Sequence, residues 1–176
     1  FFDKVKTLTA KFTQAVLDEV LNLIQETSGR LWIERPGKFR WDYQQPYEQQ
    51  IISNGDKIWT YDVELAQVTV RAMDKVVGQT PASLIAGKGK IEDKFIIKDE
   101  GMIGSLQWMQ LIPKDKESQF EKVRVGFEKG QIKILEMSDS FGQTTRVELY
   151  EIQQNRKIDK DKFQFKPPKD VDVVEN

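Results

Sequence analysis

Turn-forming residues recur along this chain at short intervals, and apolar and polar residues alternate between them. Alternation with a period of two places successive side chains on opposite faces of a strand. The segment FEKVRVGFEKGQIKILEMSDSFGQTTRVELYEI at 120–152 predicts three successive strands, with turns near Lys129-Gly130 and Phe141-Gly142. Asn54-Gly55 is a strong hairpin signal between two further strands. The pattern therefore constrains the chain to an antiparallel arrangement of short-turned strands.

The same pattern predicts about eleven strands in a meander, and no linker divides them. The fold class we expect is mainly β, as one large, curved antiparallel sheet or barrel in a single domain over residues 1–176. The beginning of the chain is ambiguous, because Leu8, Phe12 and Val16 suit a helix as well as a strand.

The segment LWIERPGKFRW at 31–41 predicts a hairpin with two possible registers. A two-residue turn at Pro36-Gly37 would put apolar and charged residues on the same face. A three-residue turn, which adds Lys38, pairs Arg35 with Phe39 instead. We favour this second register, because it gathers the apolar residues of both strands on one face. That face consists of Leu31, Ile33, Phe39, Trp41 and Tyr43.

In this register Arg35 lies at a strand end and faces the apolar side of the hairpin. Arginine is seldom buried without a partner. Two interpretations stay open from the residues alone. Arg35 either bonds to a specific group inside the fold, or its long side chain reaches water at the rim.

The segment QTPASLIAGKG is the clearest helical exception. Thr80 suits the N-cap, Pro81 the first helical position and Gly87 the end, which predicts a helix of about two turns. Such a short helix is not stable alone in water and must dock on the sheet. Further short helices are expected at 159–163 and 1–6. These helices either form a lid over a cavity or cap an ordinary core.

Charge and residue absences narrow the function. The chain carries 27 basic and 28 acidic residues, so it has no basic surplus typical of a nucleic-acid-binding protein. It contains no cysteine and no histidine, which excludes thiol nucleophiles, histidine-dependent triads and cysteine–histidine zinc sites. Carboxylate-only catalysis stays possible. The chain begins at Phe1 rather than Met, so we expect a processed or trimmed form.

Several motifs resemble one family. GRLWIERPGKFRW is followed by NGDKIWTYD, with FTQ at 12–14, TPASLIA at 80–86 and FQFKPP at 163–168 in the same order. Together they resemble the periplasmic lipoprotein carrier family, LolA. The resemblance implies an incomplete β-barrel of eleven antiparallel strands with a helical lid over an apolar cavity. It also implies that the ambiguous segment is strand from Leu8 onward, with helix only before it.

The resemblance further implies a function and partners. Members ferry acylated lipoproteins across the periplasm, from an inner-membrane ABC transporter to an outer-membrane receptor. We therefore expect a monomeric carrier with no enzymatic activity, no cofactor and no metal. Three alternatives remain: the outer-membrane receptor of the same fold, an envelope-stress sensor domain of the same fold, and a carboxylate-dependent enzyme acting on lipid or glycan.

The site residues also follow from the resemblance. Arg35 aligns with the arginine that is thought to hydrogen-bond the backbone of the lid and hold the empty cavity shut. Ala82-Ser83 is smaller than the bulky apolar pair that we expect in the lid, so the lid is expected to be looser or the cavity differently shaped. With the inward-facing residues of the hairpin, the expected acyl-chain cavity and lid comprise Phe2, Leu8, Leu31, Ile33, Phe39, Trp41, Tyr43, Leu84 and Ile85.

Overall fold

The computed structural model describes residues 1–76 and 79–176 of the chain. Its main element is one twelve-stranded sheet in the order β12-β6-β5-β4-β3-β2-β1-β11-β10-β9-β8-β7. The strands are β1 (Thr7–Leu17), β2 (Leu23–Glu34), β3 (Lys38–Gln45), β4 (Gln49–Asn54), β5 (Lys57–Asp62), β6 (Gln67–Ala72), β7 (Phe95–Ile103), β8 (Leu106–Pro113), β9 (Phe120–Glu128), β10 (Gln131–Asp139), β11 (Thr144–Gln154) and β12 (Asp172–Glu175).

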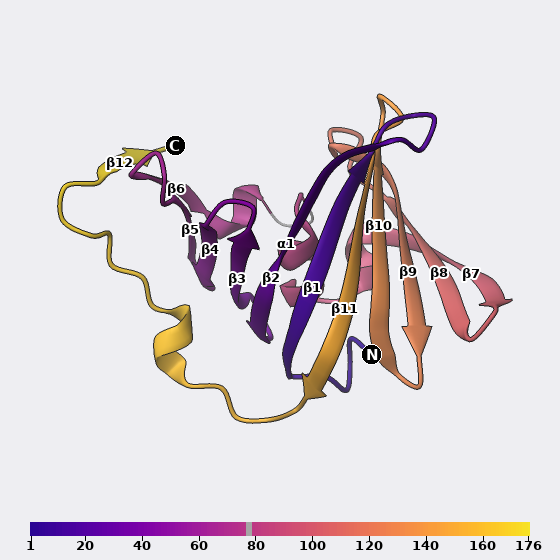
Figure 1. Ribbon diagram of the computed structural model, residues 1–176. Coiled ribbons are helices and arrows are strands. Elements are labelled where there is room, and N and C mark those ends of the chain that lie inside the picture. The colour runs from indigo at the N-terminus through magenta and orange to yellow at the C-terminus, as the bar shows by residue number, and fades with distance from the viewer. Residues whose placement is uncertain (77–78) are drawn as a thin grey trace.

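The sheet curves strongly but does not close (Figure 1). Its two halves, β1–β6 and β7–β11, join where β1 pairs with β11, and the edges are β7 and β12. These antiparallel pairings confirm the predicted mainly β, unclosed fold. The exception is β12, which pairs in parallel with β6 and adds a strand to the expected eleven.

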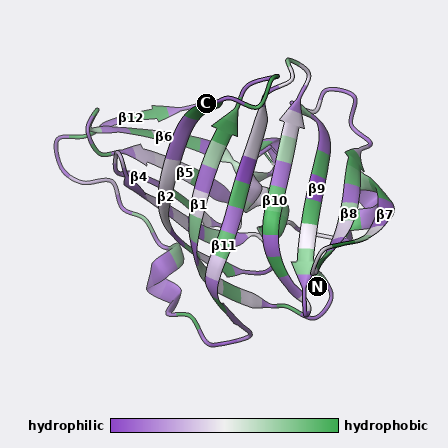
Figure 2. Ribbon diagram, turned by 45° about the vertical axis from the view of Figure 1, so that its right-hand side comes forward, coloured by the Kyte–Doolittle hydropathy of each residue, from purple (hydrophilic) through white to green (hydrophobic). Residues whose placement is uncertain are grey.

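The core lies on the concave side of the sheet, where α1 is also found (Figure 1). Along β1, the side chains of Leu8, Ala10 and Phe12 are buried and alternate with partly exposed neighbours. Hydrophilic and hydrophobic segments accordingly alternate along many strands in Figure 2. This is the expected pattern for a sheet with one buried face.

The β2–β3 hairpin confirms the predicted apolar face but not the predicted register. Ile33 pairs with Phe39 and Glu34 with Lys38, so the loop consists of residues 35–37 and Arg35 is not paired with Phe39. The two registers differ by two residues, which leaves every side chain on the same face. Gly37, with φ of 82°, is the last loop residue, as three-residue hairpin loops favour.

The helices are short. They are η1 (Met73–Lys75), α1 (Pro81–Ala86), α2 (Ile91–Lys94) and η2 (Lys160–Phe163). The helix predicted at 80–87 and the helical turn predicted at 159–163 are confirmed. The helix predicted at 1–6 is wrong, because this segment forms a single turn in which the N–H of Val5 donates to the Phe1 carbonyl. Within the described residues, none of the helices has the length and apolar character needed to cross a membrane.

The β4–β5 hairpin differs from its prediction by one residue. Its loop is Gly55-Asp56 rather than Asn54-Gly55, because β4 extends to Asn54. The Asn54 side-chain oxygen accepts hydrogen bonds from the N–H groups of Asp56 and Lys57, both at 2.9 Å. Asparagine therefore stabilises this turn from its first flanking position.

Candidate functional site

An apolar cavity of about 190 Å³ lies over β7, β8 and β9. The turn at residues 1–6 and the segment 89–92 form its other walls. Asp3, Arg35, Lys90 and Glu92 contribute charged groups to its lining. The apolar lining consists of Phe1, Phe2, Ile91, Ile97, Met109, Leu111, Val125 and Phe127. An apolar cavity with a few polar groups is the usual form of a small-molecule or lipid site.

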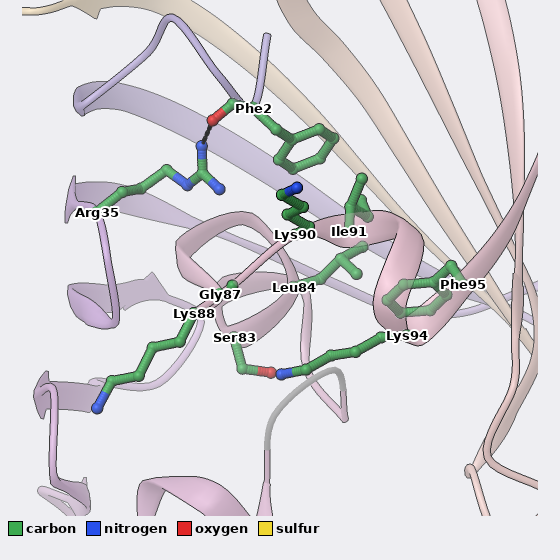
Figure 3. Close-up of a pocket in the computed structure, with 11 residues that line it drawn as sticks. Phe2, Arg35, Ser83, Leu84, Gly87, Lys88, Lys90, Ile91, Lys94 and Phe95 are labelled. Atoms are coloured by element: carbon green, nitrogen blue, oxygen red, sulfur yellow. Dashed lines mark hydrogen bonds between the residues drawn. The ribbon is translucent and has the colours of Figure 1, made fainter.

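A second, smaller void of about 20 Å³ lies between Phe2, Arg35 and the end of α1 (Figure 3). Leu84 of α1, Ile91 of α2 and Phe95 at the start of β7 line it. Phe2, Arg35 and Ile91 border both spaces, so the two form neighbouring parts of one apolar region.

Arg35 ties the hairpin loop to the N-terminal turn. Its Nη1 donates to the Phe2 carbonyl, and its guanidinium carbon lies 5.2 Å from the centre of the Phe2 ring. Its main-chain N–H donates to the Lys6 carbonyl at 2.7 Å. The guanidinium can both donate to the Phe2 carbonyl and lie near the Phe2 ring, because it is planar and rich in donors.

The surroundings of Arg35 are only partly suited to its charge. Burial lowers the pKa of the Arg35 guanidinium, and the nearby Asp3 carboxylate opposes this shift. Its Nε is buried and has no hydrogen-bond partner among the described residues. The side chain is thus held inside the fold at a cost, which is consistent with a specific tether and disfavours the alternative of a side chain that merely reaches water.

The tie between the hairpin loop and α1 comes from Gly37 rather than from Arg35. The Gly37 N–H donates to the Ala86 carbonyl at 2.6 Å, at the end of α1. The buried Ser53 hydroxyl donates to the Gly37 carbonyl at 2.8 Å and accepts from the Gly55 N–H at 3.1 Å. The Arg35 side chain therefore bonds the backbone at Phe2, one of the residues expected in the cavity and lid, whereas the bond from the hairpin loop to α1 comes from Gly37. The role of Arg35 as a latch stays a prediction.

A capping box defines the start of α1. The Thr80 hydroxyl accepts from the Ser83 N–H at 3.1 Å, and the Ser83 hydroxyl accepts from the Thr80 N–H at 3.1 Å. The helix packs against β2 and β3, and its residues from Ala82 to Ala86 are buried. Small residues at 82 and 83 thus form part of a tightly packed cover.

The motifs noted in the sequence lie almost entirely within a region that matches a known protein family. The model described as "Outer membrane lipoprotein carrier protein LolA" matches residues 3–166. The chain belongs to the LolA family. This membership confirms the resemblance inferred from the sequence.

Individual LolA-family relatives agree over the whole chain. An outer-membrane lipoprotein carrier protein from Nitrosospira multiformis is 45% identical over 99% of this chain and 84% of its own length. One from Methylococcus capsulatus is 45% identical over 100% of this chain and 85% of its own. The solved structure of a LolA superfamily protein from Nitrosomonas europaea shows the same fold, with a TM-score of 0.54, 9% identity and coverage of 92% of this chain and 91% of that one.

The predicted site residues fall into three groups. Phe2, Arg35 and Leu84 line the two voids. Tyr43 is partly buried, and its hydroxyl donates to the Gln14 side-chain oxygen at 3.0 Å. The others are almost fully buried in the closed core: Leu8, Leu31, Ile33, Phe39, Trp41 and Ile85. Their role in holding acyl chains stays a prediction.

Sequence reasoning did not select the cavity wall formed by β7, β8 and β9. Ile97, Met109 and Leu111 lie on two paired strands, and Val125 and Phe127 lie on the third. The alternation at Val123, Val125 and Phe127 indicated their inward face. Nothing in a strand pattern distinguishes an inward residue that packs from one that borders a void.

Proposed function

We propose that this protein is a periplasmic carrier that shelters the acyl chains of outer-membrane lipoproteins. It receives them as a monomer from an inner-membrane ABC transporter and delivers them to an outer-membrane receptor, and no bond is made or broken. The observation that carries this proposal is an apolar cavity beneath the N-terminal turn, which Arg35 of the hairpin loop holds through hydrogen bonds to the Phe2 and Lys6 carbonyls. The printed names of the curated relatives support the same function.

The energetics favour enclosure of the cargo. A buried methylene is worth about 0.8 kcal/mol, so one long acyl chain contributes roughly 10 kcal/mol when it is fully sheltered. Pockets for drug-sized ligands measure about 300–1,000 Å³. The present cavity of about 190 Å³ is smaller. Loading therefore requires the covers to move and the cavity to grow.

We propose that Arg35 is the latch of one of these covers. It holds the N-terminal turn, which carries Phe1 and Phe2 over the cavity. Breaking the latch costs free energy when cargo enters, and the same free energy is returned when cargo leaves. The closed, empty state competes with the loaded state and so lowers the apparent affinity for the acyl chains. The lower affinity allows the cargo to be released to the receptor.

The test is a reconstituted transfer assay with Arg35→Leu. This change removes a charge-assisted bond worth about 1.5–3 kcal/mol and adds apolar surface beside the cavity. We expect the variant to accept lipoprotein but to release it poorly to the receptor, so that a loaded complex accumulates. Arg35→Lys should show part of the defect, because an ammonium group cannot reproduce the guanidinium fork.

Arg30→Leu is the matched control. Arg30 is an exposed arginine on β2, the strand that leads into the hairpin loop, and its guanidinium carbon lies 5.8 Å from the centre of the Trp32 ring. Transfer by this variant should be normal. Wild-type transfer rates for Arg35→Leu would reject the latch, and native mass spectrometry of the protein purified from its host without any bound acylated lipoprotein would count against the carrier function itself.

A further inference from the structure

Large apolar side chains are exposed on two neighbouring loops and on the first residues of β2. One loop joins β1 to β2, and the other joins β10 to β11. The most exposed side chains are those of Leu21, at 71%, and Phe141, at 85%. We call the whole set the apolar tip: Val20, Leu21, Leu23, Ile24 and Phe141.

The two loops have the same hydrogen-bond pattern. In the first, Asp18 Oδ1 accepts from the N–H groups of Val20 and Asn22, at 3.0 and 2.8 Å. In the second, Asp139 Oδ1 accepts from the N–H groups two and four residues later, both at 2.9 Å. In each loop the aspartate N–H also donates to the carbonyl of the residue four positions later. Both loops are thus rigidly held, and each presents an apolar side chain two residues after its aspartate.

The loops differ at the residue three positions after the aspartate. Gly142 occupies it in the second loop with φ of 82°, and Leu21 occupies it in the first with φ of 66°. This left-handed conformation costs an L-residue roughly 1–2 kcal/mol and is free for glycine. The β1–β2 loop therefore has a strained, exposed leucine at the position where the β10–β11 loop has glycine, which adopts this conformation without strain. Folding does not require this leucine, so a contact outside the chain is the better explanation.

The two loops touch each other. A Cβ added at Gly142 would lie 2.9 Å from the Cβ of Glu19, and the loops lie side by side at the top of Figure 1. The exposed side chains of both loops therefore lie at the same end of the molecule. Apolar side chains gathered in this way usually mark a site of interaction.

The charges of the two loops restrict the occupant. Asp18, Glu19 and Asp139 are acidic, and neither 18–24 nor 138–143 contains a lysine or arginine. An anionic bilayer would be repelled, and so would a second copy of the same acidic tip. We propose that the apolar tip docks into an apolar recess ringed by lysine and arginine on a membrane protein partner. This inference rests on the proposed function, which requires the carrier to dock at membranes.

The test is co-sedimentation with three preparations: inner-membrane vesicles of the host bacterium, its outer-membrane vesicles, and liposomes made from the extracted lipids. We expect binding to at least one of the protein-containing preparations and none to the liposomes. Leu21→Asn should weaken this binding about tenfold or more, since a leucine side chain is no longer buried. It should not lower stability, because asparagine tolerates the left-handed conformation.

Leu65→Asn is the matched control, because Leu65 is equally exposed, at 70%, on the β5–β6 loop. It should bind as the wild type does. Phe141→Ser should weaken binding like Leu21→Asn, and Glu19→Lys should weaken it by removing charge complementarity. If Glu19→Lys instead strengthens binding to vesicles and liposomes alike, the occupant is the bilayer and the proposal is wrong.

Other results would also overturn the docking surface. They are unchanged vesicle binding by Leu21→Asn, no vesicle binding by the wild type, or a concentration-dependent dimer that Leu21→Asn abolishes. Binding of a fluorescent fatty acid is measured on the same samples. If the wild type does not bind it, the carrier function fails. If the wild type and all variants bind the fatty acid, and the variants also bind vesicles as the wild type does, only the proposed docking surface is wrong.

Discussion

The concave face of the sheet is covered in two different ways. Over β2 and β3 the cover is α1, a helix with a complete capping box and five buried residues. Over β7, β8 and β9 the cover is a single turn at residues 1–6 together with the segment 89–92, and a cavity remains beneath it. One region is packed like an ordinary core, and the other is incompletely filled.

The difference lies in the local chemistry of the two covers. Helix α1 satisfies its first N–H groups internally and loses little by staying docked. The N-terminal turn is held by Asn155, which bonds the backbone of Lys4 and Lys6, and by Arg35, a charged group in surroundings that lower its pKa. A single turn held by hydrogen bonds at its ends opens more readily than a packed helix with five buried residues. We therefore expect cargo to enter first over β7–β9 and to reach the core beneath α1 only as α1 lifts.

The largest test of this comparison contrasts two aromatic residues. Trp41 is 1% exposed in the packed region, and Phe127 borders the cavity. Trp41→Ala should lower the free energy of unfolding by about 3–5 kcal/mol, because it leaves a hole in a closed core. Phe127→Ala should cost roughly 1–2 kcal/mol, since part of its ring already lacks neighbours.

Urea unfolding measures both costs, and a fluorescent fatty acid measures cavity binding at the same time. We expect Phe127→Ala to change fatty-acid binding while the far-ultraviolet circular dichroism stays the same. Equal losses of stability from the two variants would show that the two regions are packed alike, and the comparison would then be wrong.

Much of the packed region is predictable from sequence, for a physical reason. Alternation fixes which face a side chain occupies, so the burial of Leu31 and Trp41 follows from their positions in the hairpin. The predicted register of this hairpin was wrong because the predicted loop, 36–38, and the observed loop, 35–37, give registers that differ by two residues and place every side chain on the same face. Gly37 carried the missing information, since the left-handed residue of a three-residue loop is its last one.

The cavity and the last strand were not predictable in this way. β12 is parallel to β6, and all four of its residues are exposed, so no buried face marks it in the sequence. The bond from Arg35 to Phe2 joins residues 33 positions apart and depends on where the N-terminal turn docks. Local patterns specify faces and turns, whereas these features depend on contacts between distant segments.

A smaller effect is expected from the cap of α1. Thr80→Ala removes one half of the capping box and should cost about 1 kcal/mol. Because α1 is the tighter cover, the loss should appear as faster amide hydrogen exchange in residues 81–86, with little change in the N-terminal turn. Thr145→Ala is a control on a strand away from both covers. Equal acceleration at both covers would mean that they open as one unit.

The smallest effect on stability at neutral pH is expected at Tyr43. This residue tests how far water is excluded from the packed region. Burial raises the pKa of the Tyr43 hydroxyl to about 12, from 10.0. Between these two pH values the Tyr43 hydroxyl keeps its proton in the folded state and loses it in the unfolded state. Its contribution to the free energy of unfolding is therefore complete below pH 10 and is lost as the pH rises from about 10 to about 12.

Tyr43→Phe should remove this part of the loss of stability at alkaline pH, measured as the difference between the urea midpoints of the variant and the wild type from pH 9 to pH 12. Absorbance at alkaline pH should show the same step near 12 in the wild type alone. A variant that loses stability with pH just as the wild type does would place the hydroxyl in contact with water, and the region around it would then be less tightly closed than its buried neighbours indicate.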